Sequence, residues 1–281
     1  MEQTAADAGT TACHSVGATT LQTPVGDRII GPRPALIAVA HGSRDPRSAA
    51  TMYAVVEQLS TARPDLDVRL AFLDLNAPSV DQVVDAVAAE GHSHAVVVPL
   101  LLGSAFHARV DLPGMLAAAR ARHPRLQLTQ ADVLGADTRV IAALRDRVRE
   151  ALAVSSLGQV FPARSRLGIA MAAVGSSSAA ANARTAQVAR QLAAITGLPA
   201  EICFATTAPS LPEAVSALRA RGADHILVAP WFLAPGLLTD RLEAAAPRLV
   251  HAPTIGAHPL LTDVILDRYI AASALPLKLS A

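Results

Sequence analysis

Residues 36–46 read LIAVAHGSRDP, from Leu36 to Pro46, and this stretch decides the fold that we expect. An apolar run of strand length ends at His41, a Gly-Ser step follows, and a helical pattern begins at Ser48. A buried strand that turns directly into a helix is the repeating unit of an open α/β sheet. Such sheets bind ligands beyond the carboxyl ends of their strands. We therefore expect His41 to lie at the edge of a ligand-binding crevice.

The same alternation of short apolar segments and helical patterns continues through the chain. The expected strands are 35–40, 67–74, 95–102, 127–133, 167–174, 200–205, 226–232 and 249–252. The expected helices are 48–61, 79–90, 111–123, 137–152, 179–197, 211–221, 240–245 and 262–272. Short apolar strands separated by amphipathic helices predict parallel sheets that are covered on both faces.

The chain is expected to divide into two similar halves. The predicted parts are a flexible leader at 1–33, a half-domain carrying the site at 34–153, a linker at 154–166 and a second half-domain at 167–275. The segment NAPSV at Asn76–Val80 recurs as TAPSL at Thr207–Leu211. An internal repeat of this kind predicts two tandem, doubly wound α/β domains with a cleft between them, and a single merged sheet is the alternative.

Three polar side chains that follow strands of the first half are apolar in the aligned second half. The aligned pairs are His41 with Val174, Asp74 with Ala205, and His107 with Leu238. If these polar residues supported the fold, the second half would need them as well. We therefore expect the first half to carry the chemistry and the second half to form one wall of the cleft.

Composition and motifs exclude several functional classes. A net charge of +1 argues against nucleic-acid and membrane-surface binding. The chain has neither a Gly-x-Gly-x-x-Gly motif nor a P-loop, which disfavours dinucleotide and nucleoside-triphosphate binding. Cys13 and Cys203 lie far apart, as is typical of reduced thiols. Residues 1–33 fit neither a secretory signal nor a membrane span, so we expect a cytoplasmic protein.

His41 and His107 are the residues most suited to chemistry. Each follows a strand, and such positions converge across one crevice in a doubly wound sheet. Two neutral imidazoles bind Fe²⁺, Co²⁺, Ni²⁺ or Zn²⁺, and they accept protons near neutral pH. Asp74, at the end of the second strand, would orient an imidazole, join the metal site or accept a proton. The alternatives are surface-loop histidines and an aspartate that only caps a turn.

Five further residues are candidates for substrate binding. Gly42 and Ser43 open a helix, whose N-terminal amides bind anions. Arg44 and Arg109 flank the two histidines and suit carboxylate recognition, as does Arg47, although solvated arginines at a helix start are common. The remaining histidines that we interpret as structural are His92, His94, His123, His251 and His258.

Three sequence segments together resemble a known family. They are VAHGSR at Val39–Arg44, AFLD at Ala71–Asp74 before Pro78-Ser79, and VPLLL at Val98–Leu102 with His107 and DLP at Asp111–Pro113. In this order and spacing they resemble the sirohydrochlorin chelatases, which are class II, ATP-independent tetrapyrrole chelatases. The resemblance covers the first half and continues through the second as a degenerate repeat.

The resemblance implies a chelatase-like fold and the insertion of Fe²⁺ (for sirohaem) or Co²⁺ (for cobalamin) into sirohydrochlorin. The metal is a substrate, and no permanent cofactor is implied. By position, His41 and His107 match the family's metal ligands and proton acceptors. A glutamate often stands in the family where this chain has Asp74, which leaves the role of that carboxylate open. Val174 and Leu238 lack the histidine pattern, so we expect one active site.

Alternative functions remain open at this point. The same two histidines would serve a non-enzymatic carrier of a metal or a tetrapyrrole, or a ferrochelatase acting on another porphyrin. A two-domain sugar- or phosphate-binding protein is a further alternative at the level of the fold. Because two half-domains close a cleft within one chain, the sequence is compatible with a monomer.

Overall fold

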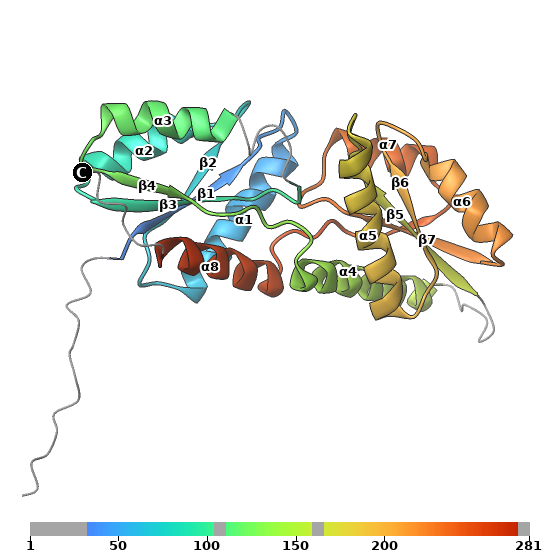
Figure 1. Cartoon of the computed structure of the whole chain (residues 1–281). Helices are drawn as coiled ribbons and strands as arrows, with labels where there is room; N and C mark the ends of the chain where they lie inside the picture. The colour runs from blue at the N-terminus through green and yellow to red at the C-terminus, as the bar shows by residue number, and fades with distance from the viewer. Residues whose placement is uncertain (1–32, 104–110, 159–165, 275–281) are drawn as a thin grey trace, which may run out of the picture. The chain divides into compact units, whose positions relative to one another are not determined.

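The computed structural model describes residues 33–103, 111–158 and 166–274 (Figure 1). From Arg33 onward the chain forms one compact unit. Within the described residues, it contains two four-stranded parallel sheets, one in each repeat, as the alternation predicted. Among the described helices, none is both long enough and apolar enough to cross a membrane.

The two sheets have the same strand order. The first sheet runs β2-β1-β3-β4, with β1 at Ala35–Ala40, β2 at Val68–Phe72, β3 at His94–Pro99 and β4 at Gln127–Gln130. The second runs β6-β5-β7-β8, with β5 at Leu167–Ala173, β6 at Ala200–Phe204, β7 at His225–Pro230 and β8 at Val250–His251. The shared order shows that the sequence repeat is a structural repeat, with two sheets rather than one merged sheet.

Helices follow the strands in chain order. They are α1 at Pro46–Ala62, α2 at Val80–Ala89, α3 at Leu112–Arg122, α4 at Thr138–Gly158, α5 at Ala179–Thr196, α6 at Leu211–Ala220, α7 at Leu237–Ala245 and α8 at Pro259–Ser273. α4 extends beyond the helix expected at 137–152 and into the expected linker at 154–166.

β1 lies inside the first sheet and is buried along its whole length. Its side chains alternate between the two faces: Ile37 packs in a core cluster with residues of α2 and α3, whereas Leu36 packs in a cluster that includes residues of α1 and α8. A strand buried on both faces reads as a continuous apolar run, which is why the pattern at Ala35–Ala40 was informative.

The start of α1 differs slightly from the expectation of a helix at 48–61. Asp45 is the N-cap, and its side chain accepts a hydrogen bond from the Arg47 amide at 2.9 Å. Pro46 occupies the first turn, where its missing N–H has no consequence. The helix therefore begins two residues before the expected start at Ser48.

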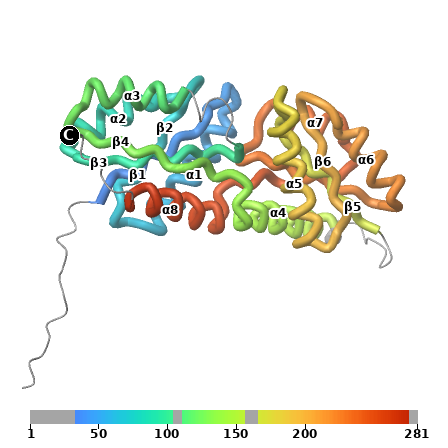
Figure 2. The backbone as a smooth tube through the Cα atoms, in the orientation of Figure 1, coloured from blue at the N-terminus to red at the C-terminus, as the bar shows by residue number. Residues whose placement is uncertain are grey.

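The last helix of each repeat packs against the sheet of the other repeat. α4 contacts α5, β7 and β8, whereas α8 contacts α1, β3 and β4 (Figure 2). The buried Tyr269 on α8 donates a hydrogen bond from Oη to the carbonyl of Pro34, at the start of the first repeat, at 2.6 Å. Arg147 on α4 donates to the carbonyl of Ile255 in the second repeat at 3.0 Å. The exchange joins the halves through one core cluster.

Candidate functional site

His41 and Asp74 lie side by side at the carboxyl ends of β1 and β2. The Asp74 amide donates to the carbonyl of His41 at 3.0 Å, and the Leu73 amide donates to the carbonyl of Ala40 at 2.9 Å. Both His41 and Asp74 are exposed. The parallel pairing of the two strands therefore brings an imidazole and a carboxylate to one sheet edge, as the sequence predicted.

Gly42 allows this close approach. Its φ is +96°, a conformation that L side chains rarely adopt. A Cβ atom at this position would lie 1.7 Å from the carbonyl oxygen of Asp74. The turn after His41 therefore needs glycine both for its conformation and for the absence of a side chain.

Ser43 is fully engaged in holding the turn. Its amide donates to Oδ1 of Asn76 at 2.7 Å, and its Oγ accepts a hydrogen bond from the Asp45 amide at 3.1 Å. Asn76 follows Asp74 closely in the chain, so these bonds tie the loop after β1 to the loop after β2. They give Ser43 a structural role in addition to the substrate-binding role expected of it.

Asp74 also stabilises its own loop. Its Oδ1 accepts from the Leu75 amide at 2.7 Å, while its carbonyl accepts from the Asn76 amide at 2.8 Å. Leu75 has a φ of 64° and is the one non-glycine residue with positive φ among the described residues. Strained backbone of this kind clusters at functional sites. The turn role and the catalytic role that the sequence left open for Asp74 are therefore compatible.

The other predicted site residues differ in what the structure shows of them. His107 and Arg109 lie outside the described residues. The chain reaches them from β3, which pairs with β1: the Leu100 amide donates to the carbonyl of Val39 at 2.8 Å. Arg44 is exposed and has no polar partner among the described residues, which leaves its guanidinium available to a ligand.

The second repeat contains the same turn with a different side chain. Gly175 has a φ of +94°, and the Thr206 amide donates to the carbonyl of Val174 at 3.0 Å. Val174, which is 45% exposed, stands where the first repeat has His41. The backbone of the turn is therefore common to both repeats, whereas the imidazole belongs to the first.

The hydrogen bonds correct one aligned pair. The Ala205 amide donates to the carbonyl of Ala173, just as Leu73 donates to Ala40, so Asp74 corresponds to Thr206 and not to Ala205. The alignment was wrong because the first repeat has one more residue in this loop. The second repeat still lacks an ionisable group here: the Thr206 hydroxyl donates to the Val174 carbonyl at 2.7 Å.

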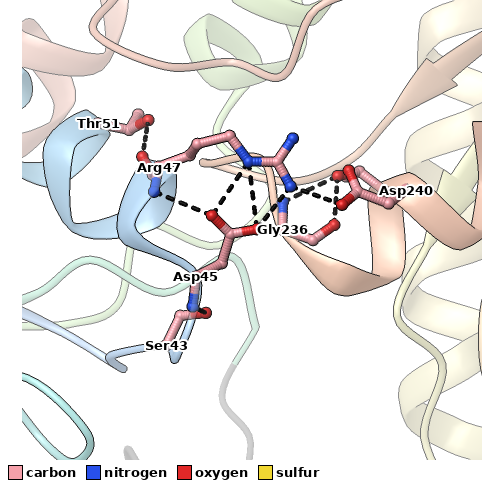
Figure 3. A network of polar contacts seen from close by, with 7 residues as sticks. Ser43, Asp45, Arg47, Thr51, Gly236 and Asp240 are labelled. Carbon is pink, nitrogen blue, oxygen red and sulfur yellow. Dashed lines mark hydrogen bonds and ion pairs between the residues drawn. The ribbon is translucent and has the colours of Figure 1, made fainter.

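An ion-pair network that the sequence did not predict lies beside the turn (Figure 3). Nη2 of Arg47 lies 2.5 Å from Oδ2 of Asp45 and 2.6 Å from Oδ2 of Asp240, the latter on α7 of the second repeat. The pKa of Arg47 is raised by its hydrogen bonds, first by the bond to Asp45 and second by the bond to Asp240. The same guanidinium lowers the pKa of Asp45. In the structure Arg47 therefore pairs with two carboxylates.

Comparison with known proteins identifies the family. The model of the CbiX family matches residues 35–151 and 168–272, which is most of the chain. The chain belongs to the CbiX family of sirohydrochlorin chelatases. The resemblance stated from the motifs is thereby confirmed.

Relatives of this CbiX-family chain include enzymes named for two different metals. It is 28% identical over 245 residues to a sirohydrochlorin cobaltochelatase of Priestia megaterium, covering 82% of this chain and 77% of the relative. It is 25% identical over 243 residues to a sirohydrochlorin ferrochelatase of Bacillus subtilis, covering 83% and 90%.

Solved structures support the fold of the CbiX-family chain. SirB from Bacillus subtilis with Fe³⁺ superposes with a TM-score of 0.73 at 23% identity, covering 86% of this chain and 96% of SirB. SirB from Bacillus subtilis subspecies spizizenii in complex with cobalt superposes with a TM-score of 0.67 at 24% identity, covering 87% and 97%.

Several other histidines of the CbiX-family chain contact protein groups. Nε2 of His94 lies 2.9 Å from the Thr129 hydroxyl, and burial lowers the pKa of this imidazole. Nδ1 of His258 accepts from the Leu260 amide at 3.2 Å at the start of α8, and burial likewise lowers its pKa. These contacts agree with the structural roles interpreted from the sequence.

One cluster of possible metal ligands lies elsewhere, at the amino edge of the first sheet. Asp67, Glu90 and His92 lie close enough to share an ion. However, the Arg69 guanidinium already hydrogen-bonds to both Asp67 and Glu90. Because one guanidinium already engages both carboxylates, we interpret this cluster as a surface ion-pair network.

Proposed function

We propose that this protein is a sirohydrochlorin chelatase that inserts Fe²⁺ or Co²⁺ into the macrocycle, with His41 and His107 as metal ligands and proton acceptors. The observation that carries the proposal is the His41 turn. A backbone hydrogen bond holds His41 and Asp74 next to each other at one sheet edge, and the second repeat has the same turn with Val174 and Thr206 instead.

The reaction requires groups that release a metal and take up protons. Metal entry displaces two pyrrole N–H protons, and a base with a pKa near neutrality lowers the barrier for that step. Imidazole meets both requirements because its neutral form binds divalent metals and accepts a proton. In this proposal His41 and His107 hold the metal at one face of the macrocycle, transfer it, and accept the displaced protons.

Asp74 and the surrounding cationic groups have supporting roles in the proposal. The carboxylate of Asp74 orients the His41 imidazole or accepts a proton from it. Arg44 and Arg109 bind peripheral carboxylates of the tetrapyrrole, and the Gly42-Ser43 turn lines the same edge. No nucleotide and no permanent cofactor take part, and one chain supplies the whole site.

A parallel insertion assay tests the proposal. The full-length protein is mixed with sirohydrochlorin and Fe²⁺, Co²⁺ or Ni²⁺, and the absorbance of the metallated product is followed. We expect many turnovers per protein molecule with Fe²⁺ or Co²⁺. Imidazole and carboxylate ligands bind all three ions, so the three rates show which of them the site inserts.

The assay also separates the two alternatives. A carrier would bind metal or tetrapyrrole stoichiometrically and give no turnover. With protoporphyrin or coproporphyrin added as parallel substrates, a ferrochelatase for another porphyrin would metallate one of them faster than sirohydrochlorin. Either result would contradict the proposed function.

A further inference from the structure

The second repeat contacts the helix that follows the His41 turn through a charged side chain. Asp240, in the first turn of α7, accepts a hydrogen bond from Nη2 of Arg47 at 2.6 Å (Figure 3). Arg47 is the second residue of α1, the helix that follows the His41 turn. The ion pair therefore joins the starts of two helices that belong to different repeats.

From Arg47 a series of hydrogen bonds leads to the turn. The Arg47 guanidinium donates to Asp45 through Nε at 3.0 Å and through Nη2 at 2.5 Å. The Asp45 amide donates to Oγ of Ser43 at 3.1 Å, and the Ser43 amide donates to Oδ1 of Asn76 at 2.7 Å. This series ends in the two loops that hold His41 and Asp74.

The start of α7 is itself well ordered by local bonds. The Gly236 amide donates to Oγ1 of Thr239 at 2.9 Å, and the Thr239 hydroxyl donates to the carbonyl of Gly236 at 2.7 Å. Thr239 is buried. A Cβ on Gly236 would lie 3.9 Å from Cβ of Asp45, so the two helix starts lie close together. α7 therefore presents Asp240 from a fixed position.

The corresponding turn of the second repeat lacks this arrangement. There α5 begins with the N-cap Ser178, which accepts from the Ala181 amide, and alanines follow at the positions of Pro46 and Arg47. Arginine at the helix start and histidine in the turn are thus both confined to the first repeat. Because the arginine and the histidine occur in the same repeat and are both replaced in the other, we connect the ion pair with the chemistry proposed for the turn.

We infer that Asp240 of the second repeat is a positioning residue for His41, acting through Arg47 and Asp45 to hold the turn. The inference rests on the proposed role of His41. It assigns the second repeat a part in the reaction besides the wall of the cleft that was expected from the sequence. Because the side chains of Arg47 and Asp240 are 51% and 46% exposed, the pair contributes little to global stability.

Substitutions of Asp240 in the full-length protein test the inference. Asp240→Asn removes the charge and keeps the shape, whereas Asp240→Glu keeps the charge. Glu243→Gln is the matched control, because Glu243 lies on α7, is exposed and has no side-chain partner among the described residues. We expect Asp240→Asn to lower kcat for metal insertion about threefold to fivefold with an unchanged Tm, as is typical of an exposed ion pair. Asp240→Glu should restore most of the rate, and Glu243→Gln should equal the wild type.

Two further readouts distinguish positioning from a general structural effect. In a double-mutant cycle, Asp240→Asn should have no additional effect in an Arg47→Gln background. The difference between wild type and Asp240→Asn should also shrink as ionic strength rises, because salt screens exposed charges. Additive losses, or a difference independent of salt, would overturn the inference.

A measurement without substrate separates this inference from the proposed function. The His41 ring resonances, assigned by comparison with His41→Ala, should shift in Asp240→Asn and remain unchanged in Glu243→Gln. If the wild type inserts no metal while the resonances shift, the proposed function fails and the coupling of Asp240 to the turn stands. If Asp240→Asn matches Glu243→Gln in both rate and His41 resonances, the inference is wrong.

Discussion

Gly42 connects the backbone of the turn to the geometry of the candidate site. Its positive φ disfavours any L side chain, and the nearby carbonyl of Asp74 leaves no room for a Cβ atom. Gly91 has a similar φ of +88°, but a Cβ there would meet no atom within 4 Å. Alanine substitutions at the two glycines therefore separate the cost of the backbone conformation from the cost of the steric clash.

We expect Gly42→Ala to be considerably more destabilising than Gly91→Ala. Gly91→Ala should cost about 1–2 kcal/mol, the price of a left-handed conformation for an L residue. Gly42→Ala adds a clash that separates the loops after β1 and β2, so its cost should exceed that of Gly91→Ala by at least about 1 kcal/mol. Urea unfolding of both variants measures the difference, and equal costs would show that the contact with Asp74 relaxes freely.

Asp74→Asn tests whether the carboxylate acts in the reaction. Asparagine retains Oδ1 as an acceptor for the Leu75 amide, so the loop should keep its conformation. Loss of the charge should lower the insertion rate about 10- to 100-fold without abolishing it, as is usual for a group that orients a metal-binding histidine. Asp263→Asn, an exposed change on α8, is the control. An unchanged rate in Asp74→Asn would reduce Asp74 to a turn residue.

At the scale of helices and strands, the exchange of α4 and α8 governs how the halves unfold. Each helix covers the sheet of the other repeat, so neither repeat keeps its full core without the other. Trp231, the single tryptophan, is buried just after β7 in the second repeat and belongs to the shared core cluster. Its fluorescence therefore reports on the second repeat.

We expect Tyr269→Phe to destabilise both repeats together. The change removes the hydrogen bond to the Pro34 carbonyl and should lower the free energy of unfolding by about 1 kcal/mol. Trp231 fluorescence and far-ultraviolet circular dichroism should show the same shift in midpoint. Tyr53→Phe is the control, because the Tyr53 side chain is half-exposed and its hydroxyl makes a longer hydrogen bond, of 3.2 Å. A shift in circular dichroism with no shift in fluorescence would contradict the shared core.

The elements were largely predictable because their signals are local. The apolar run at Ala35–Ala40 predicted a buried strand, and the segments at Asn76–Val80 and Thr207–Leu211 predicted the repeat. The exchange of α4 and α8 was not predictable, because an amphipathic helix shows that it has a partner but not which sheet the partner is. The continuation of α4 into the expected linker was missed because Ser155, Ser156 and Gly158 weaken the helical pattern.

At the scale of the whole molecule, the two repeats share a fold and differ in the side chains of the turn. The sequence predicted that His41 and Asp74 lie at the same sheet edge, because the ends of parallel strands meet at one edge. It did not predict that Arg47 binds Asp240, since an ion pair between residues distant in the chain depends on the tertiary arrangement. The match of Asp74 with Thr206 was also missed. The segments that flank this loop align well between the repeats, and their alignment hides the one extra residue that the first repeat has in the loop.

The central claim is that His41 and His107 carry metal insertion. The most direct test is the initial rate of Co²⁺ or Fe²⁺ insertion into sirohydrochlorin by His41→Ala and by His107→Ala. His92→Ala, which removes an imidazole from the opposite edge of the first sheet, is the control. We predict that both site variants fold but no longer insert the metal, whereas the control inserts it. Insertion at the wild-type rate by either His41→Ala or His107→Ala would contradict the account.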